Sequence, residues 1–187
     1  MKRYALFGTV LMILVSLSGG AEGAAPHCGQ WRWGVKTLQD AAAAQVNMTS
    51  IPTTVEALRA LAVPGPLGPN VSRFAEEMNT YSLRARLLKA KQEADSDFHL
   101  VLAGSSGKTM VAEIPSPSCI GTVGGAAMRQ TRAEFLRRFG QPSSTHFVTY
   151  AGSPAVTMTG VLFFDEVHGQ AGVAPNGMEL HPVLGIR

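Results

Sequence analysis

Residues 98–114 read Phe-His-Leu-Val-Leu-Ala-Gly-Ser-Ser-Gly-Lys-Thr-Met-Val-Ala-Glu-Ile, and this stretch decides the fold. Phe98 to Ala103 and Thr109 to Ile114 are mainly apolar runs of strand length, and the Gly-Ser-Ser-Gly segment between them is a typical hairpin connection. Pro115 stops the second run, because proline cannot donate a hydrogen bond to a strand ladder. The stretch therefore predicts two antiparallel strands joined by a tight turn.

The segments on either side extend this pattern. Residues 81–87 alternate apolar and polar side chains, which predicts a half-buried strand, and residues 91–96 form a polar turn. Residues 121–140 place apolar side chains at helical spacing, and Gly140 with Pro142 ends that helix. Three more segments indicate β structure: His146–Tyr150, Val156–Phe164 and Met178–Ile186.

The expected order is three strands, one helix, then two or three strands. This fold class is mainly β with one helix (α+β), and we place it in residues 79–187. The order is typical of a small OB-like Greek-key barrel of five strands, whose helix lies between strands three and four. A generic α+β domain with a small antiparallel sheet fits the same order equally well.

Residues 26–78 are expected to form a partly helical lead-in. Val55 to Ala62 has helical spacing, and residues 63–70, with three prolines and two glycines, predict a loop.

The first 25 residues have the three parts of a secretory signal peptide. Lys2 and Arg3 give a positive start, residues 4–17 carry no charge, and small residues dominate positions 18–25. The apolar run is shorter than the roughly 20 residues that span a bilayer. We therefore expect a secreted or periplasmic protein that is soluble, with no membrane insertion after signal cleavage. The cleavage candidates are Ala21, Gly23 and Ala25.

Two cysteines, Cys28 and Cys119, follow the signal. In an oxidising compartment they predict one disulfide, which closes a loop of about 90 residues and stabilises by roughly 4 kcal/mol in the loop-entropy model. Two free thiols or half a metal site are the alternatives. The net charge of +3 is mild and gives no argument for a nucleic-acid partner.

Two acidic and histidine-containing segments are candidate sites. In extended structure Asp97 and His99 share one face of their strand, and Glu179 and His181 share one face of another. Such groups bind divalent metal ions and act as general acids and bases. These four residues are therefore the catalytic and metal-ligand candidates, with a divalent ion as the candidate cofactor.

Three residues between them are binding candidates. Asp165, His168 and Asn176 lie in or beside a glycine-rich loop that could join the same cluster. A structural polar network is the alternative for all seven, and Glu113 fits a ligand and a solvated edge residue equally well.

Four stretches of the sequence resemble stretches of other proteins. Residues 95–102, 109–119, 160–165 and 168–184 are similar to those of a group of small uncharacterised secreted bacterial proteins. The shared motifs are D-x-D-x-H-L-V-L, A-E-I-P-x-P-x-C and H-G-Q-x-G-x-A-P-N-G-x-E-L-H-P-V. The resemblance implies export and a shared fold, and it brings no activity with it.

Two functions remain open, so whether the chain is an enzyme is undecided. The first is an exported binding or accessory module that uses an OB-like face for an oligosaccharide, an oligonucleotide or a protein. The nearest candidate contacts are Arg84, Arg86, Lys89 and Lys91. The second is a secreted metal-dependent hydrolase, a nuclease-like phosphodiesterase, that uses the Asp/His/Glu cluster.

Overall fold

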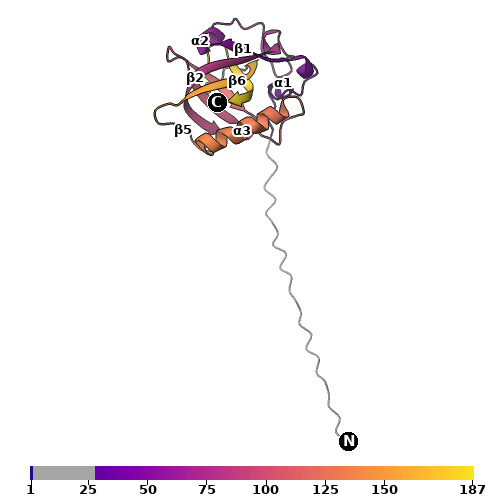
Figure 1. Cartoon of the computed structure of the whole chain (residues 1–187). Coiled ribbons are helices and arrows are strands. Elements are labelled where there is room, and N and C mark those ends of the chain that lie inside the picture. The colour runs from indigo at the N-terminus through magenta and orange to yellow at the C-terminus, as the bar shows by residue number, and fades with distance from the viewer. Residues whose placement is uncertain (2–27) are drawn as a thin grey trace.

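A computed structural model describes Met1 and residues 28–187 (Figure 1). The expected signal peptide lies outside the described residues apart from Met1. The helical elements are α1 (Trp33–Lys36), η1 (Ala43–Gln45), α2 (Val55–Arg59), η2 (Glu76–Met78) and α3 (Gly125–Phe139). The strands are β1 (Asn47–Thr53), β2 (Asn79–Gln92), β3 (Phe98–Ala103), β4 (Thr109–Ile114), β5 (Val148–Thr149), β6 (Ala155–Phe164) and β7 (Met178–Ile186).

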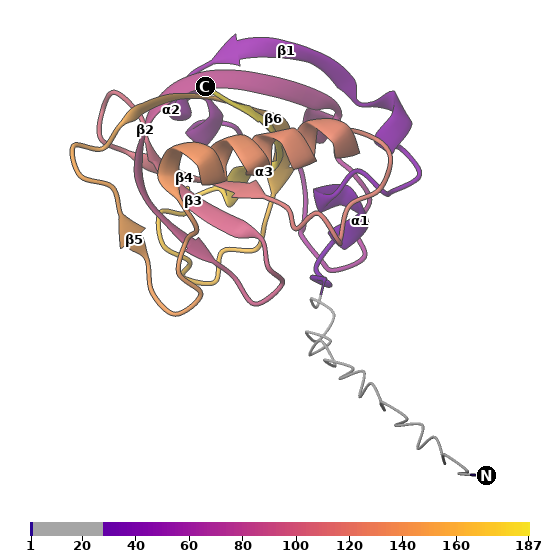
Figure 2. The same cartoon turned by 60° about the horizontal axis from the view of Figure 1, so that its bottom comes forward.

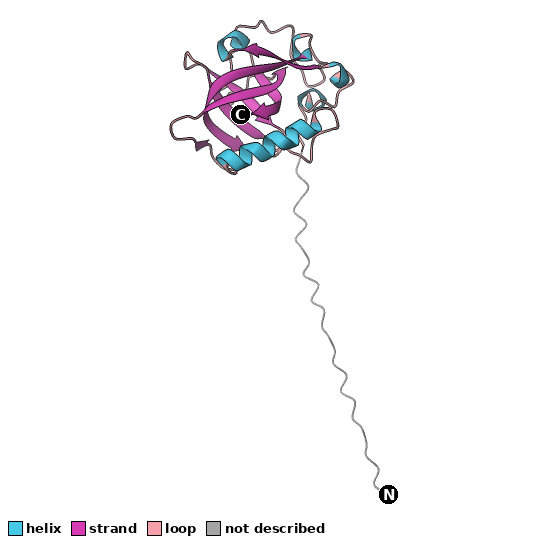
Figure 3. Ribbon diagram, viewed as in Figure 1, coloured by secondary structure: helices cyan, strands magenta, loops and turns pink. Residues whose placement is uncertain are grey.

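Five strands close into a barrel in the order β2, β3, β4, β7, β6 and back to β2. Figure 3 shows the strands in magenta and the helices in cyan around them. The β4–β7 pair is parallel and the other four pairs are antiparallel. The length of β2 permits closure, because residues 80–86 pair with β6 and residues 86–92 pair with β3. With α3 between β4 and β6 in the chain, this is the OB-like α+β barrel that the sequence predicted.

The core fills the barrel and extends to one face of α3. In β2, Leu83, Ala85 and Leu87 are buried while Arg84 and Arg86 are exposed, which confirms the predicted alternation. Figure 2 shows α3 lying across the barrel. Met128 and Phe135 are the buried apolar side chains of this helix. The Phe135 ring packs against Phe98 of β3, with ring centroids 5.5 Å apart.

The lead-in packs against the barrel through a buried ion pair. Arg32 donates to both carboxylate oxygens of Glu77, at 2.8 and 2.6 Å, and to the carbonyl oxygen of Phe164 in β6. Glu77 in turn accepts the backbone N–H of Phe164. The predicted disulfide Cys28–Cys119 is present and fixes the start of the lead-in to the β4–α3 connection. These contacts place α1 beside the barrel strands.

The structure also differs from the sequence prediction in some elements. β1 and α1 were not anticipated, because neither segment has a clear hydrophobic period. All of β1 except its last residue is exposed, and the strand is held by parallel pairing to β2. The helix expected over residues 55–62 ends at Arg59. The turn expected from Lys91 begins later, because β2 continues to Gln92.

Candidate functional site

Strand pairing brings two histidines to one glutamate. His99 of β3 lies opposite Glu113 of β4, and the parallel β4–β7 register places His181 beside the same carboxylate. The His99 Nδ1 atom lies 3.0 Å from Glu113 Oε1, and His181 Nδ1 lies 3.1 Å from Glu113 Oε2. Glu113 therefore joins the two histidines through its two oxygens.

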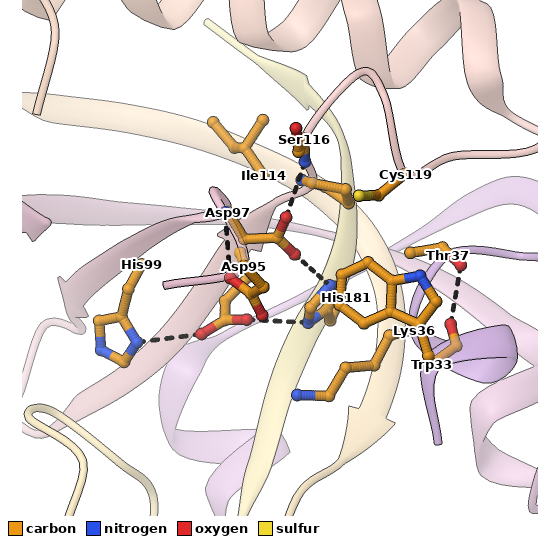
Figure 4. A network of polar contacts seen from close by, with 12 residues as sticks. Trp33, Lys36, Thr37, Asp95, Asp97, His99, Ile114, Ser116, Cys119 and His181 are labelled. Atoms are coloured by element: carbon orange, nitrogen blue, oxygen red, sulfur yellow. Dashed lines mark hydrogen bonds and ion pairs between the residues drawn. The ribbon is translucent and has the colours of Figure 1, made fainter. Parts of the chain in front are cut away.

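Asp97 lies at the far side of the His181 ring (Figure 4). Its Oδ1 accepts the backbone N–H of Ser116 at 2.7 Å, and its Oδ2 lies 3.4 Å from His181 Nε2. Asp97 and His181 are completely buried, and the rings of Trp33 and Phe163 stand edge-on to the imidazole. Solvent has no direct access to this pair.

Lys36 of α1 extends the network toward the β6–β7 loop. Its Nζ lies 3.1 Å from Asp165 Oδ2 and 3.9 Å from Glu179 Oε1, and that Glu179 oxygen lies 3.1 Å from His181 Nδ1. The loop is closed at Gly177, whose carbonyl accepts the Asp165 N–H. Gly177 has a φ of +68°, and a side chain there would collide with the Asp165 carbonyl. Glycine at position 177 therefore permits the close contact that holds Asp165 at the start of the β6–β7 loop.

Both histidines are held in the charged form. His99 directs Nδ1 at Glu113 and Nε2 at the Ala171 carbonyl, 2.9 Å away, so both nitrogens face acceptors. Burial lowers the pKa of His99, but the hydrogen bond and charge of Glu113 outweigh it and raise the pKa to about 9. For His181, burial is likewise outweighed by Asp97, Glu113 and Glu179, which hold its pKa well above the ordinary value.

The two glutamates shift in opposite directions. Burial raises the pKa of Glu113, but hydrogen bonds from His181 and His99 outweigh it and hold that pKa well below the ordinary 4.5. Burial and then the charge of Glu113 raise the pKa of Glu179 to about 7, against the opposing effect of Lys36. Glu113 is therefore ionised at neutral pH, while Glu179 titrates there.

A pocket of about 200 Å³ opens above this network. Its base contains His99, Glu113 and Lys36, which are almost completely buried. The rest of the lining comes from residue 31, the β2–β3 loop and the β6–β7 loop: Trp31, Glu93, Asp95, Asp165, Glu166, His168 and Gln170. Five carboxylates thus surround one lysine and two histidines.

The structure brings most of the sequence candidates together. Asp97, His99, Glu179 and His181 belong to one network, Asp165 joins through Lys36, and His168 lies at the pocket rim. Asn176 does not join: its side-chain amide donates to the carbonyls of Leu58 and Leu61 at the end of α2. Asn176 lies outside the network because the loop turns its side chain toward α2.

Two members of the network, Glu113 and Lys36, are not among the seven sequence candidates. The sequence left Glu113 open between a ligand and a solvated edge residue, and the structure places it, buried, at the centre of the network. A signal existed, because a hairpin between residues 98–103 and 109–114 pairs His99 with Glu113 directly. Lys36 had no such signal, since it lies in a segment without strand or helix periodicity.

A carboxylate and imidazole triad within the network could hold a metal ion. Asp97, Glu113 and His181 each offer one ligand atom, and these atoms lie within 4.8 Å of one another. His99 does not belong to this triad, and its two nitrogens face Glu113 and the Ala171 carbonyl. Oxygen and imidazole ligands suit Zn²⁺ and other borderline divalent ions.

Neither a family model, nor a curated protein, nor a solved structure matches this chain. Within residues 28–187, no helix is both long enough and apolar enough to cross a membrane.

Proposed function

We propose that this protein is an exported binding module whose pocket takes a small cationic ligand. The observation that carries this proposal is the position and charge of the pocket. It lies over β3 and β4, between the β2–β3 and β6–β7 loops. In OB barrels this is the face on which ligands bind, since those elements are the second and third strands and the L12 and L45 loops.

The charge of the lining selects the class of ligand. The carboxylates of Glu93, Asp95, Glu113, Asp165 and Glu166 exceed the positive charges of Lys36 and His99. A phosphate backbone would be repelled there, which argues against the oligonucleotide considered from the sequence. An ammonium or guanidinium group gains charge-assisted hydrogen bonds to the same carboxylates.

The base of the pocket is preorganised. Lys36, His99 and Glu113 are each held by buried partners before any ligand arrives. A ligand therefore orders few side chains when it binds, which reduces the entropic cost of association.

Calorimetry on the purified protein tests this proposal. Probes are a primary diamine, a guanidinium compound, Ca²⁺, a neutral disaccharide and a dinucleotide. We expect the organic cations to bind, and Glu93→Gln and Glu166→Gln to weaken them about tenfold each, the loss of roughly one charge-assisted hydrogen bond. Glu134→Gln, which changes a partly exposed carboxylate outside the pocket, is the matched control. Binding of the disaccharide alone, or equal affinity in all variants, would overturn the proposal.

Export is supported by two features. The first 25 residues have the composition of a signal peptide, and a disulfide joins Cys28 to Cys119. The intact mass of the protein collected outside the cytoplasm should match a chain that begins at Glu22, Ala24 or Pro26. A full-length chain retained in the cytoplasm would contradict export.

The resemblance to small secreted bacterial proteins belongs to the same proposal. Its stretches contribute Asp95, His99 and Glu113 together with His168 and Gln170, all of which line the pocket. If the group shares this fold, its motifs describe one ligand site.

A metal-dependent hydrolase is the second candidate, favoured by the Asp97, Glu113 and His181 triad. Burial of Asp97 and His181 disfavours it, because a substrate cannot reach them directly. If a metal ion binds there, Zn²⁺ raises the melting temperature through linkage and Asp97→Asn removes the effect. An unchanged melting temperature in Zn²⁺ and in chelator removes this candidate.

A further inference from the structure

A second hollow lies between α3 and the end of β7, away from the acidic pocket. It encloses about 700 Å³ and continues into a smaller hollow of about 230 Å³ bordered by β1, β2 and β6. The two hollows share Leu184, Gly185 and Arg187 in their linings, and we call them together the α3–β7 groove. Figure 2 shows α3 and the C-terminal end of the chain on the same side of the barrel.

The α3–β7 groove is basic. Arg137, Arg138 and Arg187 line it, and Glu134 is the one acidic side chain in its lining. Glu134 is bound to Arg137, with 2.5 Å between Oε1 and Nη2. Arg138 and Arg187 are exposed and form no ion pair within residues 28–187.

Strand register adds a further arginine beside the groove. Arg84 of β2 pairs with Thr157 of β6, and Thr157 exchanges backbone hydrogen bonds with Arg187 on its other side. Paired residues direct their side chains to the same face of a sheet. Arg84 and Arg187 therefore flank Thr157 on the outer surface, and the positive charge continues from α3 across the barrel.

The remaining lining is rich in hydrogen-bonding groups. Hydroxyl and amide side chains are contributed by Ser50, Ser82, Gln130, Thr131, Thr157 and Thr159. No aromatic side chain is present in the lining, so unpaired bases would find no ring on which to stack. The chemistry matches a chain that presents both hydroxyl groups and regularly spaced negative charges.

We propose that the α3–β7 groove binds an acidic polysaccharide. Its carboxylate or sulfate groups pair with Arg138 and Arg187, and its hydroxyls bond to the serine and threonine side chains. Arginine suits this role because its planar guanidinium binds such anions with two parallel hydrogen bonds.

This surface is distinct from the cation pocket. Glu179, which belongs to the network beneath that pocket, lies near the start of β7, and Arg187 directly follows the end of β7, so about 25 Å of strand lies between them at 3.3 Å per residue. The two surfaces also have opposite charge. Polysaccharide binding can therefore fail or succeed without any change in the cation pocket.

The test is affinity electrophoresis and calorimetry with polygalacturonate, with uncharged dextran and a single-stranded oligonucleotide as comparison probes. We expect polygalacturonate to bind at 50 mM salt, with an affinity that falls as salt rises because counterions are released. Arg138→Gln with Arg187→Gln should weaken binding tenfold or more. Arg129→Gln, an exposed arginine on α3 outside the groove lining, is the matched control and should have little effect.

A second variant gives a change in the opposite direction. Glu134→Gln removes the negative charge of the groove and frees Arg137, so affinity for polygalacturonate should rise severalfold. Loss of folding cannot produce a rise. The proposal is overturned if polygalacturonate does not bind, if the arginine double variant binds it unchanged, or if the oligonucleotide binds more tightly than polygalacturonate.

Discussion

At the scale of single residues, the imidazole of His99 links stability to pH. Its pKa is raised from 6.5 to about 9, because Glu113 and the Ala171 carbonyl stabilise the charged ring. The folded state therefore holds a proton that the unfolded state releases between pH 6.5 and 9. The stabilisation is complete below pH 6.5 and is lost as the pH rises through 9, by about 3 kcal/mol in total.

We therefore expect the wild-type melting temperature to fall from pH 6.5 to 9 and the fall to be shallower in His99→Gln. Calorimetric scans at half-unit pH intervals measure both curves. His146→Gln replaces an exposed histidine, and its curve should parallel that of the wild type. Parallel curves for His99→Gln and wild type would show that Glu113 does not hold the His99 proton.

The sequence predicted the histidines of this network better than their partners. The Asp-x-His and Glu-x-His spacings place Asp97 with His99 and Glu179 with His181 on common strand faces, and the structure joins all four in one network. Glu113 is buried because the lead-in and the β6–β7 loop cover the outer face of β4. The covering of that face depends on tertiary packing, which strand periodicity does not predict.

At the scale of elements, the best-predicted segments are those in which nearly every side chain is buried. The bounds of β3 and β4 match the prediction, since each is an apolar run between turn residues. By contrast, β1 has the sequence Asn-Met-Thr-Ser-Ile-Pro-Thr, with nearly every side chain exposed. It is a strand because its backbone pairs with β2, and its side-chain pattern does not predict that pairing.

The lead-in depends on a buried ion pair, which gives a second prediction. In Glu77→Gln the guanidinium of Arg32 keeps its charge but loses its carboxylate, in a place where neither side chain is exposed. Breaking a buried pair in this way costs about 3–5 kcal/mol, because one charge remains uncompensated. Urea unfolding of the variant measures the loss.

The matched control for this change is Glu134→Gln, which breaks an exposed pair with Arg137. Solvent screens such pairs, so its unfolding midpoint should not change measurably. Equal midpoints for Glu77→Gln and wild type would mean that the lead-in does not contribute to barrel stability.

At the scale of the whole molecule, the disulfide connects stability to the pocket. Cys28 and Cys119 are 91 residues apart, and the loop they close contains α1, β1, β2, β3 and β4. The bond also holds the chain directly before Trp31 and Lys36, which line the pocket. Its loss should therefore affect ligand binding as well as unfolding.

The double variant Cys28→Ser/Cys119→Ser separates these two effects. The loop-entropy model predicts a loss of roughly 4 kcal/mol in unfolding free energy. At a temperature where the variant is still folded, we expect organic cations to bind the pocket more weakly, because the segment that carries Trp31 and Lys36 is no longer fixed at its start. Polygalacturonate should bind the α3–β7 groove nearly as before, since the arginines proposed to pair with it, Arg138 on α3 and Arg187 after β7, lie outside the loop. Equal weakening at both surfaces would instead show that the disulfide acts on the barrel as a whole.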